Sequence, residues 1–384
     1  MPDRIYLDWN ATTPLRPEAR QAMAAAWDMA GNPSSVHAEG RQARRLVEDA
    51  RAAIASAVGA RPQDVVFTSG GTEANALALT PGVRRGAGQP VRRLLVSVIE
   101  HTSVLSGGRF SPDAVGTIEV TGSGVVDVDH LRARLADGPP ALVSVMLANN
   151  ETGAVQPVSE VADIVHQAGG LLHVDAIQAL GKIPFDIKSM GADLITLSAH
   201  KVGGSKGVGA LVLAEEVQGL EPLLRGGGQE LGRRAGTENV AGIAAFGAAT
   251  TAAMAGLTAD ASRLRLLRER LEKGLMQTPG MIVFSTDAPR LPNTTLFSVP
   301  GLKAETAVIG FDLAGIAVSS GSACSSGKVQ PSHVLAAMGV GRDLAQGAVR
   351  LSLGWSTAET DIDLGLEAWR KLADALLRGR RNTA

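Results

Sequence analysis

The sequence of 384 residues contains a single cysteine, Cys324. One cysteine cannot form an internal disulfide, so no oxidative framework is available, and we expect a reducing, cytoplasmic compartment. The first ten residues, MPDRIYLDWN, lack the apolar core and the cleavage pattern of a secretory signal, which agrees with that expectation.

The chain also lacks any sizeable net charge. Its formal net charge is −1 at pH 7, from 37 Lys and Arg against 38 Asp and Glu. It therefore has no bulk electrostatic attraction to nucleic acid or to an anionic membrane, and we expect neither as a partner. Arginine far outnumbers lysine, so a lysine inside a motif is more informative than usual.

Long hydrophobic runs are scarce as well. One uncharged stretch, residues 240–258, is long enough to raise the question of a membrane span. It consists mostly of Ala, Gly and Thr, which favours a helix buried in a core. The sequence has no internal repeat or low-complexity linker, and its length and 45% apolar content fit a globular protein of two domains.

Short apolar runs rich in Val, Ile and Leu alternate with helical patterns in the first half of the chain. The expected strands are DVVFTS, RRLLVSVI, ALVSVMLA, GLLHV, DLITLS and VGALVL. Helices are expected at 41–58 and 159–168, with Ser159 as the N-cap of the second. This alternation predicts an α/β fold with a mostly parallel sheet that is buried on both faces.

The residues after Thr258 differ in character. They contain an amphipathic, Arg-rich helix at 263–273, the shorter strand candidates MIVFST, NTTLFSV and IAVSS, and a last helix near 361–378. We therefore predict a large domain at 16–257 and a smaller α+β domain formed by 1–15 and 258–384.

Polar groups follow five of the predicted strands, at the point where each strand ends. They are Gly70-Gly71-Thr72-Glu73, Glu100-His101, Asn149-Asn150-Glu151, Asp175 with Gln178, and His200-Lys201. Ligands of open α/β sheets bind outside the carboxyl ends of the strands. Five such ends in series therefore indicate one crevice with a bound ligand.

The turn at 69–73 joins a strand to the start of a helix, where free N–H groups and the helix dipole favour an anion. It lacks the G-x-G-x-x-G spacing of a dinucleotide site, which excludes a dehydrogenase, and the Gly-Lys-Ser/Thr of a nucleotide P-loop. By itself the segment is equally compatible with a plain tight turn.

Asp175 ends a buried apolar run, where an acid is costly unless a cation pairs with it. A protonated pyridine nitrogen is such a cation, and Gln178 lies where it could meet the phenolic oxygen of the same ring. A helix N-cap is the alternative role for Asp175. His101 could stack on the ring and move protons, with a structural histidine as the alternative.

Lys201 follows directly on the strand DLITLS. A lysine in a partly apolar site has a lowered pKa and can form a Schiff base. Lys206 is its main competitor for that role, and Ser198 and His200 could add phosphate contacts.

Cys324 lies in SSGSACSSG, among small polar residues. A buried structural cysteine normally sits in an apolar run, so the pattern favours a nucleophilic thiol on a mobile loop, with a chance surface thiol as the alternative. Arg350 interrupts the apolar run AVRLSLG, and its guanidinium could clamp the carboxylate of an α-amino acid.

Ten segments, taken in order, resemble the NifS/IscS-type cysteine desulfurases of the class V aminotransferase family. They are YLDWNATTP, GNPSSVH, FTSGGTEANALAL, EHTSV, NNETGAVQP, HVDAIQALGK, SAHKVGGSKGVGAL, GGGQELGRRAGTENVAG, SSGSACSSG and VRLSLG. The resemblance implies an aspartate-aminotransferase-like fold (fold type I), a homodimer and pyridoxal 5′-phosphate as cofactor. It further implies conversion of L-cysteine to L-alanine and a persulfide on Cys324, which passes to an iron–sulfur scaffold or another acceptor protein.

The resemblance also implies residue roles, and no metal site. The cofactor would be bound by Gly71, Thr72, His101, Asn150, Asp175, Gln178, Ser198, His200, Lys201 and Thr237, the last from the neighbouring subunit. Lys201, His101 and Cys324 would be catalytic, and Arg350, Asn150 and Asn10 would bind the substrate. Trp9, beside Asn10, departs from the small polar or aromatic residue more familiar at that position.

Two other interpretations of the sequence remain. An aminotransferase or selenocysteine lyase of the same fold would use Lys201 and Asp175 equally well, although a transaminase has no need of Cys324. A sulfur carrier would need only the thiol, which leaves the lysine, aspartate and phosphate set unexplained. The sequence leaves open the acceptor and the choice between cysteine and selenocysteine.

Overall fold

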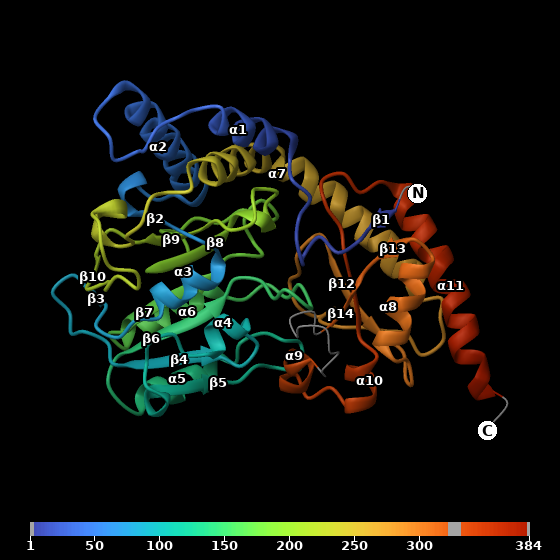
Figure 1. The fold of residues 1–384 in the computed structure, drawn as a ribbon. Coiled ribbons are helices and arrows are strands. Elements are labelled where there is room, and N and C mark those ends of the chain that lie inside the picture. Colours follow the sequence, from blue (N-terminus) through green and yellow to red (C-terminus); the bar gives the residue numbers. More distant parts are fainter. Residues whose placement is uncertain (1–3, 322–331, 382–384) are drawn as a thin grey trace.

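The computed structural model describes residues 4–321 and 332–381. Within these ranges the chain forms a seven-stranded and a four-stranded sheet that lie side by side (Figure 1). The long helix α7 (Val240–Leu275) runs from one sheet to the other. Strand β1 (Ile5–Tyr6) and helix α11 (Glu359–Arg381), from opposite ends of the chain, both lie beside the four-stranded sheet.

The seven-stranded sheet is parallel except for one strand. Its order is β2-β9-β8-β7-β6-β4-β5, and β9 alone in this sheet runs antiparallel to its neighbours. The strands are β2 (Val65–Thr68), β4 (Arg93–Ser97), β5 (Val115–Ile118), β6 (Ala141–Met146), β7 (Leu171–Asp175), β8 (Leu194–Ser198) and β9 (Gly209–Leu213). The predicted mostly parallel sheet is confirmed; β5, which is half exposed, was not among the predicted strands.

Both faces of this sheet are apolar, because successive side chains of a strand point to opposite sides. In β4, Leu95 packs in one core, whereas Leu94 and Val96 pack in the core on the other face. The first core is covered by α1 (Pro17–Trp27), α2 (Ala38–Val58), α5 (Val128–Ala136), α6 (Val158–Gln167) and α7, the second by α3 (Gly71–Ala78) and α4 (Thr102–Leu105).

The four-stranded sheet is antiparallel in the order β11-β12-β15-β14. Its strands are β11 (Ile282–Val283), β12 (Thr294–Ser298), β14 (Ser319–Ser320) and β15 (Val349–Ser352). Two short pairs, β1 with β13 (Ile316–Ala317) and β3 (Arg84–Arg85) with β10 (Val217–Gln218), complete the strands described. Three further helices are α8 (Ala304–Leu313), α9 (His333–Ala337) and α10 (Arg342–Gln346), and 3-10 turns occupy Pro62–Asp64, Pro112–Ala114, Ala199–Lys201 and Gln229–Gly232.

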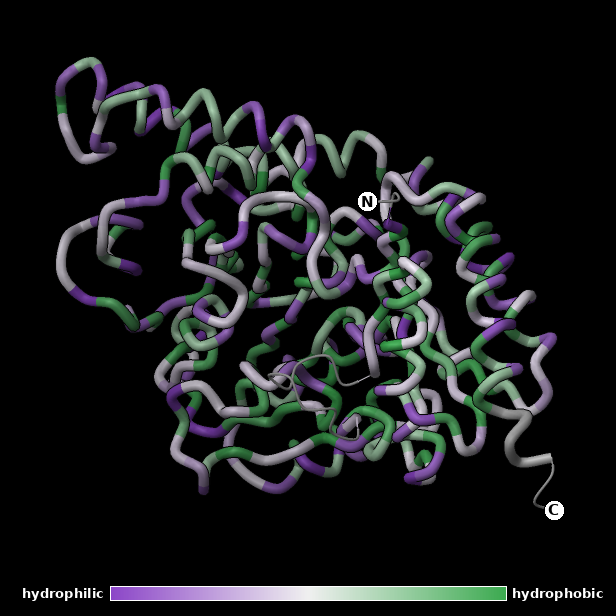
Figure 2. Tube along the Cα trace, turned by 45° about the vertical axis from the view of Figure 1, so that its right-hand side comes forward, coloured by the Kyte–Doolittle hydropathy of each residue, from purple (hydrophilic) through white to green (hydrophobic). Residues whose placement is uncertain are grey.

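A separate core lies between the four-stranded sheet and helices α7, α8 and α11. The Trp369 ring stacks on Phe311 at 6.3 Å and meets Phe297 edge-on at 5.0 Å, and all three are fully buried. The tube of α11 alternates between hydrophilic and hydrophobic segments, as expected for a helix with one face in a core (Figure 2). The pairing of β1 with β13 brings the N-terminal segment to this core, and Leu7 is buried in it.

Helix α7 differs from the prediction, which placed separate helices at 240–258 and 263–273. It is continuous, with Phe246 in the core of the large sheet and Leu267 in the core of the small one. By length and composition it could cross a membrane, but 61% of its most apolar window is buried inside the protein. The predicted domain boundary at residue 257 falls within this helix and stays a prediction.

The predicted N-cap of helix α6 is wrong. The helix begins at Val158 with Pro157 at the N-cap, so Ser159 lies in the first turn. Val158 is buried, and its packing together with the fixed φ of the proline sets the start one residue earlier. Helix α2, in contrast, ends as predicted, with Gly59 in the left-handed conformation (φ 71°) at its C-cap.

Candidate functional site

A cavity of 270 Å³ lies at the carboxyl ends of the parallel strands, where Arg350 of β15 approaches the large sheet. Eleven of the thirteen predicted site residues line it. They are Asn10, Gly71, Thr72, His101, Asn150, Asp175, Gln178, Ser198, His200, Lys201 and Arg350. The two exceptions are Thr237 and Cys324, and Cys324 falls outside the described residues.

Thr237 lines a different pocket, together with Ser69 and Arg234. The sequence assigned Thr237 to the phosphate of a neighbouring subunit. Its place outside the cavity of its own chain therefore leaves that role a prediction.

One end of the cavity suits an anion. Gly71 and Thr72 begin helix α3, whose first N–H groups have no acceptor within the helix. A Cβ on Gly71 would lie 2.3 Å from Ile177 Cδ1 and 3.4 Å from Ser198 Cβ, so only glycine fits without displacing Ile177. The N–H groups, with the hydroxyls of Thr72 and Ser198, form a setting in which a phosphate can be held.

His200 borders the same cavity and is neutral at neutral pH. Burial lowers its pKa to about 4, and the nearby charges of Lys201, Lys206 and Lys182 act in the same direction. Its Nδ1 lies 3.1 Å from Thr12 Oγ1, a contact that fixes the ring. A neutral imidazole at this point can donate a hydrogen bond but brings no charge.

Asp175 ends β7 and is 5% exposed. Its Oδ2 accepts from Asn75 Nδ2 at 2.9 Å, and its Oδ1 accepts from the Ile177 N–H at 3.0 Å. Burial raises the pKa of Asp175 despite these bonds and despite the charges of His101 and Lys201. A buried carboxylate of this kind is stabilised by a cation in the cavity, which is what the nitrogen of a protonated pyridine ring supplies.

A chain of hydrogen bonds beneath Asp175 fixes the orientation of Asn75. Thr196 Oγ1 donates to Asn75 Oδ1 at 2.5 Å and lies 3.2 Å from His173 Nε2, whose Nδ1 lies 2.8 Å from Ser144 Oγ. Burial lowers the pKa of His173 to about 3, so the ring is neutral. Because Asn75 Oδ1 is occupied by Thr196, its amide nitrogen must face Asp175.

His101 caps helix α4 through its ring. Its Nδ1 accepts the Ser103 N–H at 3.1 Å and lies 2.8 Å from Ser103 Oγ, so the proton of the neutral ring resides on Nε2. Burial lowers the pKa of His101, while the charge of Asp175 opposes this effect. The neutral ring therefore carries an N–H donor at Nε2.

Lys201 lies in the 3-10 turn that follows β8, and its Nζ donates to the carbonyl oxygens of Asn10 at 2.6 Å and Ala11 at 2.7 Å. The Asn10 carbonyl also accepts from Gln178 Nε2 at 3.0 Å. One backbone oxygen of the N-terminal segment therefore aligns both a nucleophilic amine and an amide donor toward the cavity.

The side chain of Asn10 is engaged by the protein on both of its polar atoms. Oδ1 accepts from Lys182 Nζ at 3.0 Å and from Asn293 Nδ2 at 3.1 Å. Nδ2 donates to Thr294 Oγ1 at 2.9 Å and to the Asn150 carbonyl at 3.2 Å. A direct contact between this side chain and a substrate would have to replace one of these bonds.

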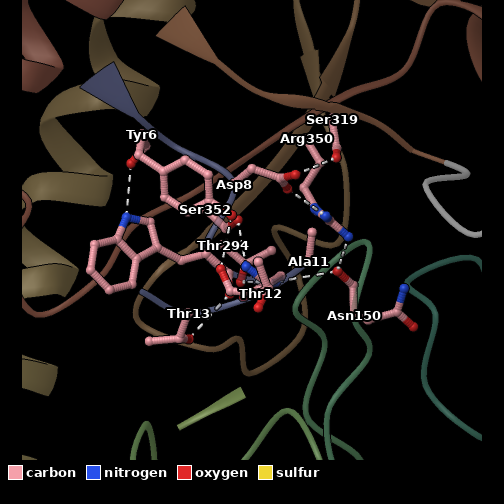
Figure 3. A network of polar contacts seen from close by, with 12 residues as sticks. Tyr6, Asp8, Ala11, Thr12, Thr13, Asn150, Thr294, Ser319, Arg350 and Ser352 are labelled. Carbon is pink, nitrogen blue, oxygen red and sulfur yellow. Dashed lines mark hydrogen bonds and ion pairs between the residues drawn. The ribbon is translucent and has the colours of Figure 1, made fainter. Parts of the chain in front are cut away.

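Arg350 is 1% exposed and lies between the two sheets. Its Nη2 donates to Asp8 Oδ1 at 2.8 Å and its Nη1 to the Asn150 carbonyl at 2.9 Å, and Ser319 holds the other oxygen of Asp8 (Figure 3). Within the described part of the chain, Arg350 Nε is buried with no hydrogen-bond partner. A guanidinium with N–H groups to spare at a cavity wall can bind a carboxylate.

Sequence reasoning gave no role to several residues that build this site. Ser103, Met146, Ala148 and Ile177 line the cavity, and Asn75, Asp8 and Lys182 hold residues that do. Ser103 had a signal, because it follows His101 at the spacing of a helix cap. The others stand in quoted motifs or in the quoted strand ALVSVMLA, but their partners are too far away in sequence to be found from spacing.

Residues 5–364 match the model of the aminotransferase class-V family, and the chain belongs to that family. A cysteine desulfurase of Cereibacter sphaeroides is 44% identical over 382 residues, 97% of each chain. A NifS-like protein of Rickettsia africae has a similar structure, with a TM-score of 0.88, 37% identity, and 97% of this chain and all of that chain covered. SspA, solved in complex with cysteine, has a TM-score of 0.75 at 29% identity, over 91% of this chain and 98% of the other.

These comparisons confirm the family and the fold class predicted from the motifs. Proteins of this family depend on pyridoxal phosphate, which confirms the predicted class of cofactor. The cavity fits that cofactor on independent grounds. It combines an anion site at α3, a buried carboxylate at Asp175 and a lysine at the end of β8.

Proposed function

We propose that this chain is a pyridoxal-phosphate-dependent cysteine desulfurase, which converts L-cysteine to L-alanine and leaves the sulfur as a persulfide on Cys324. The observation that carries the proposal is the single cavity in which Lys201, Asp175 and Arg350 meet. The relatives of similar sequence and fold support the same activity. The compartment that we propose is the cytoplasm.

In this proposal the large sheet binds the cofactor. The N-terminus of α3, with Ser198, would hold the phosphate, Asp175 would pair with the ring nitrogen, and Lys201 would be the covalent attachment point. Gln178 would donate to the phenolic oxygen, and His101 would lie against the ring. When bound, the cofactor withdraws electrons from the substrate Cα, so that a proton there can be removed.

The protein residues then position the substrate and move protons. Arg350 binds the substrate carboxylate, with Asn150 beside it. Lys201, once released, takes the Cα proton, and His101 takes part in the later proton movements as a donor through Nε2. Its lowered pKa favours the neutral His101 ring.

The sulfur transfer itself balances without an added oxidant. The Cys324 thiolate attacks the substrate sulfur and forms the S–S bond of a persulfide. The C–S bond of the substrate breaks with its electron pair remaining on Cβ, which takes up a proton. Lys201 returns a proton to Cα, and the product is alanine. Cys324 lies outside the described residues, so this step rests on the sequence.

A purified sample with a visible absorption band would be mixed with L-cysteine, and alanine and sulfide would be assayed together. We expect both products, and we expect Cys324→Ser to lose sulfide release while it keeps the band. A coloured protein that forms neither product would point to another amino acid as substrate. A protein that stays colourless with added pyridoxal phosphate would refute the proposal.

A matched lysine pair sharpens this test. Lys201→Ala is expected to lose the visible band of the bound cofactor. Lys206→Ala, five residues further on at an exposed position, is expected to keep it. The reverse result would assign the attachment to Lys206.

We also propose a homodimer with shared sites, in which Thr237 completes the phosphate site of the partner. Thr237 lines a pocket other than the cavity of its own chain. Leu231, which is 72% exposed, borders a further cavity of 540 Å³. Sedimentation should give twice the chain mass of 39.5 kDa, and Thr237→Ala should weaken cofactor binding.

The acceptor that we propose is an iron–sulfur scaffold protein, as for the resembled family. Transfer of labelled sulfur from cysteine to such a scaffold tests this step. Transfer to a different carrier would identify another acceptor, and the absence of any transfer would refute the assignment.

A further inference from the structure

Lys182 lies directly behind the wall of the cavity. It does not line the cavity, but its Nζ donates to Gln178 Oε1 at 2.5 Å and to Asn10 Oδ1 at 3.0 Å, and both of those residues do. It also borders a small cavity of 30 Å³ on the far side, which Lys201 lines as well. Lys182 is therefore one hydrogen bond away from the reacting volume.

This lysine is an unusual choice for such a position. Burial lowers the pKa of Lys182 well below its ordinary value, and the charges of Lys201 and Arg350 lower it further. Its two acceptors are neutral amides, and no carboxylate among the described residues contributes to this shift. Burial therefore favours the neutral amine, which can still donate a hydrogen to each of the two amides.

The contact fixes which way the Gln178 amide faces. A lysine amine has hydrogens to donate, so the atom of Gln178 that it touches is the oxygen. The nitrogen therefore faces Asn10 and the cavity, and one of its two hydrogens goes to the Asn10 carbonyl at 3.0 Å. Gln178 is left with its second N–H as a donor toward the cavity, polarised by the lysine behind it.

We propose that Lys182 is a positioning residue that holds the Gln178 amide as a donor to the cofactor. The inference rests on the cofactor binding described in the proposed function. An N–H donor at this place would stabilise a phenolate oxygen on the ring and so disfavour a proton on the nitrogen that links the cofactor to Lys201. Lys182 thereby lowers the pH at which that nitrogen loses its proton.

The test is the pH titration of the visible band of the holoenzyme. Lys182→Met keeps the length of the side chain but cannot donate to Gln178, and we expect the midpoint of the titration to rise by about one pH unit. Lys182→Arg keeps N–H donors and should stay within about 0.3 unit of the parent protein. Lys188→Met, at an exposed position nearby, is the control and should not move the midpoint.

A second readout is the dissociation constant of pyridoxal phosphate from the apo-protein, which should rise in Lys182→Met by about threefold to tenfold. If Lys182→Met does not fold, Lys182→Leu replaces it as the variant without a donor. A midpoint in the donor-free variant equal to that of the parent overturns the inference, and so does an equal shift in Lys182→Arg. Failure of the parent protein to bind the cofactor would instead refute the proposed function.

Discussion

Substitution of Asn10 by Ala is expected to destabilise the folded protein by about 3–5 kcal/mol. The side chain is 1% exposed and makes four hydrogen bonds. Each of the four is worth about 1 kcal/mol. Each former partner keeps another bond, for instance Asn293 to the Leu353 carbonyl, so the cost stays within this range.

The measurement is urea unfolding of the apo-protein, followed by circular dichroism, with the free energy taken from the midpoint and slope. Two variants serve as controls. Asn32→Ala, at an exposed turn, should cost less than about 1 kcal/mol. Asn10→Asp keeps the acceptor for Lys182 and should lose less than Asn10→Ala. A loss in Asn10→Ala no larger than that in Asn32→Ala would show that the residue does not join the two sheets.

Three further predictions concern Glu151, Arg350 and Asn75. Burial raises the pKa of Glu151 from 4.5 to about 7, so the folded state binds the proton more tightly than the unfolded state. The stability gained from this proton is fully present below pH 4.5 and is lost as the pH rises through 7. From pH 5 to pH 8 the parent should therefore lose about 2–3 kcal/mol more than Glu151→Gln in chemical denaturation; equal losses would contradict this. Arg350→Lys should lower kcat/KM for cysteine about 100-fold, mainly by raising KM, because lysine cannot make the bidentate contact with a carboxylate. An unchanged KM would show that Arg350 does not bind the substrate carboxylate. Asn75→Ala removes a hydrogen bond that lowers the pKa of Asp175, so pyridoxal phosphate should bind about tenfold more weakly. The loss of affinity should be larger at pH 6 than at pH 8, and an equal loss at the two pH values would contradict the prediction.

The fold could be predicted where burial is nearly uniform. Strands β4, β6, β7, β8 and β9 are apolar on both faces, and each was visible as an apolar run. Strand β5 is partly exposed at the sheet edge, so its composition gave no such signal. The single helix α7 was missed because its composition changes where it passes from one core to the other.

The sequence predicted which residues line the site but not which of them are hydrogen-bonded to one another. Parallel strands bring their carboxyl ends to one edge, so Asp175 and Lys201 had to lie close together. The bond from Asn75 to Asp175 spans 100 residues, and that from Lys201 to Asn10 spans 191. No spacing rule reaches so far, since such contacts depend on how the two sheets are packed.

Trp9 shows how a departure from a family pattern can be explained by packing. It is 3% exposed, and its Nε1 donates to the Tyr6 carbonyl at 2.8 Å. A Cβ on Gly354 would lie 1.9 Å from the Trp9 ring, so the indole fills space that exists only because residue 354 is glycine. The tryptophan and the glycine are thus one structural unit.

This unit has a consequence for the chemistry next to it. Trp9 is followed at once by Asn10, whose carbonyl aligns Lys201 and Gln178. The N-terminal segment is also tied to the small sheet, through the bond from the Asn10 N–H to Ser352 Oγ at 2.9 Å. The lysine of the large sheet therefore takes its position from a backbone oxygen that the small sheet holds in place. Since Arg350 belongs to that same small sheet, one rigid segment sets both the attachment point of the cofactor and the distance to the group that would bind the substrate carboxylate.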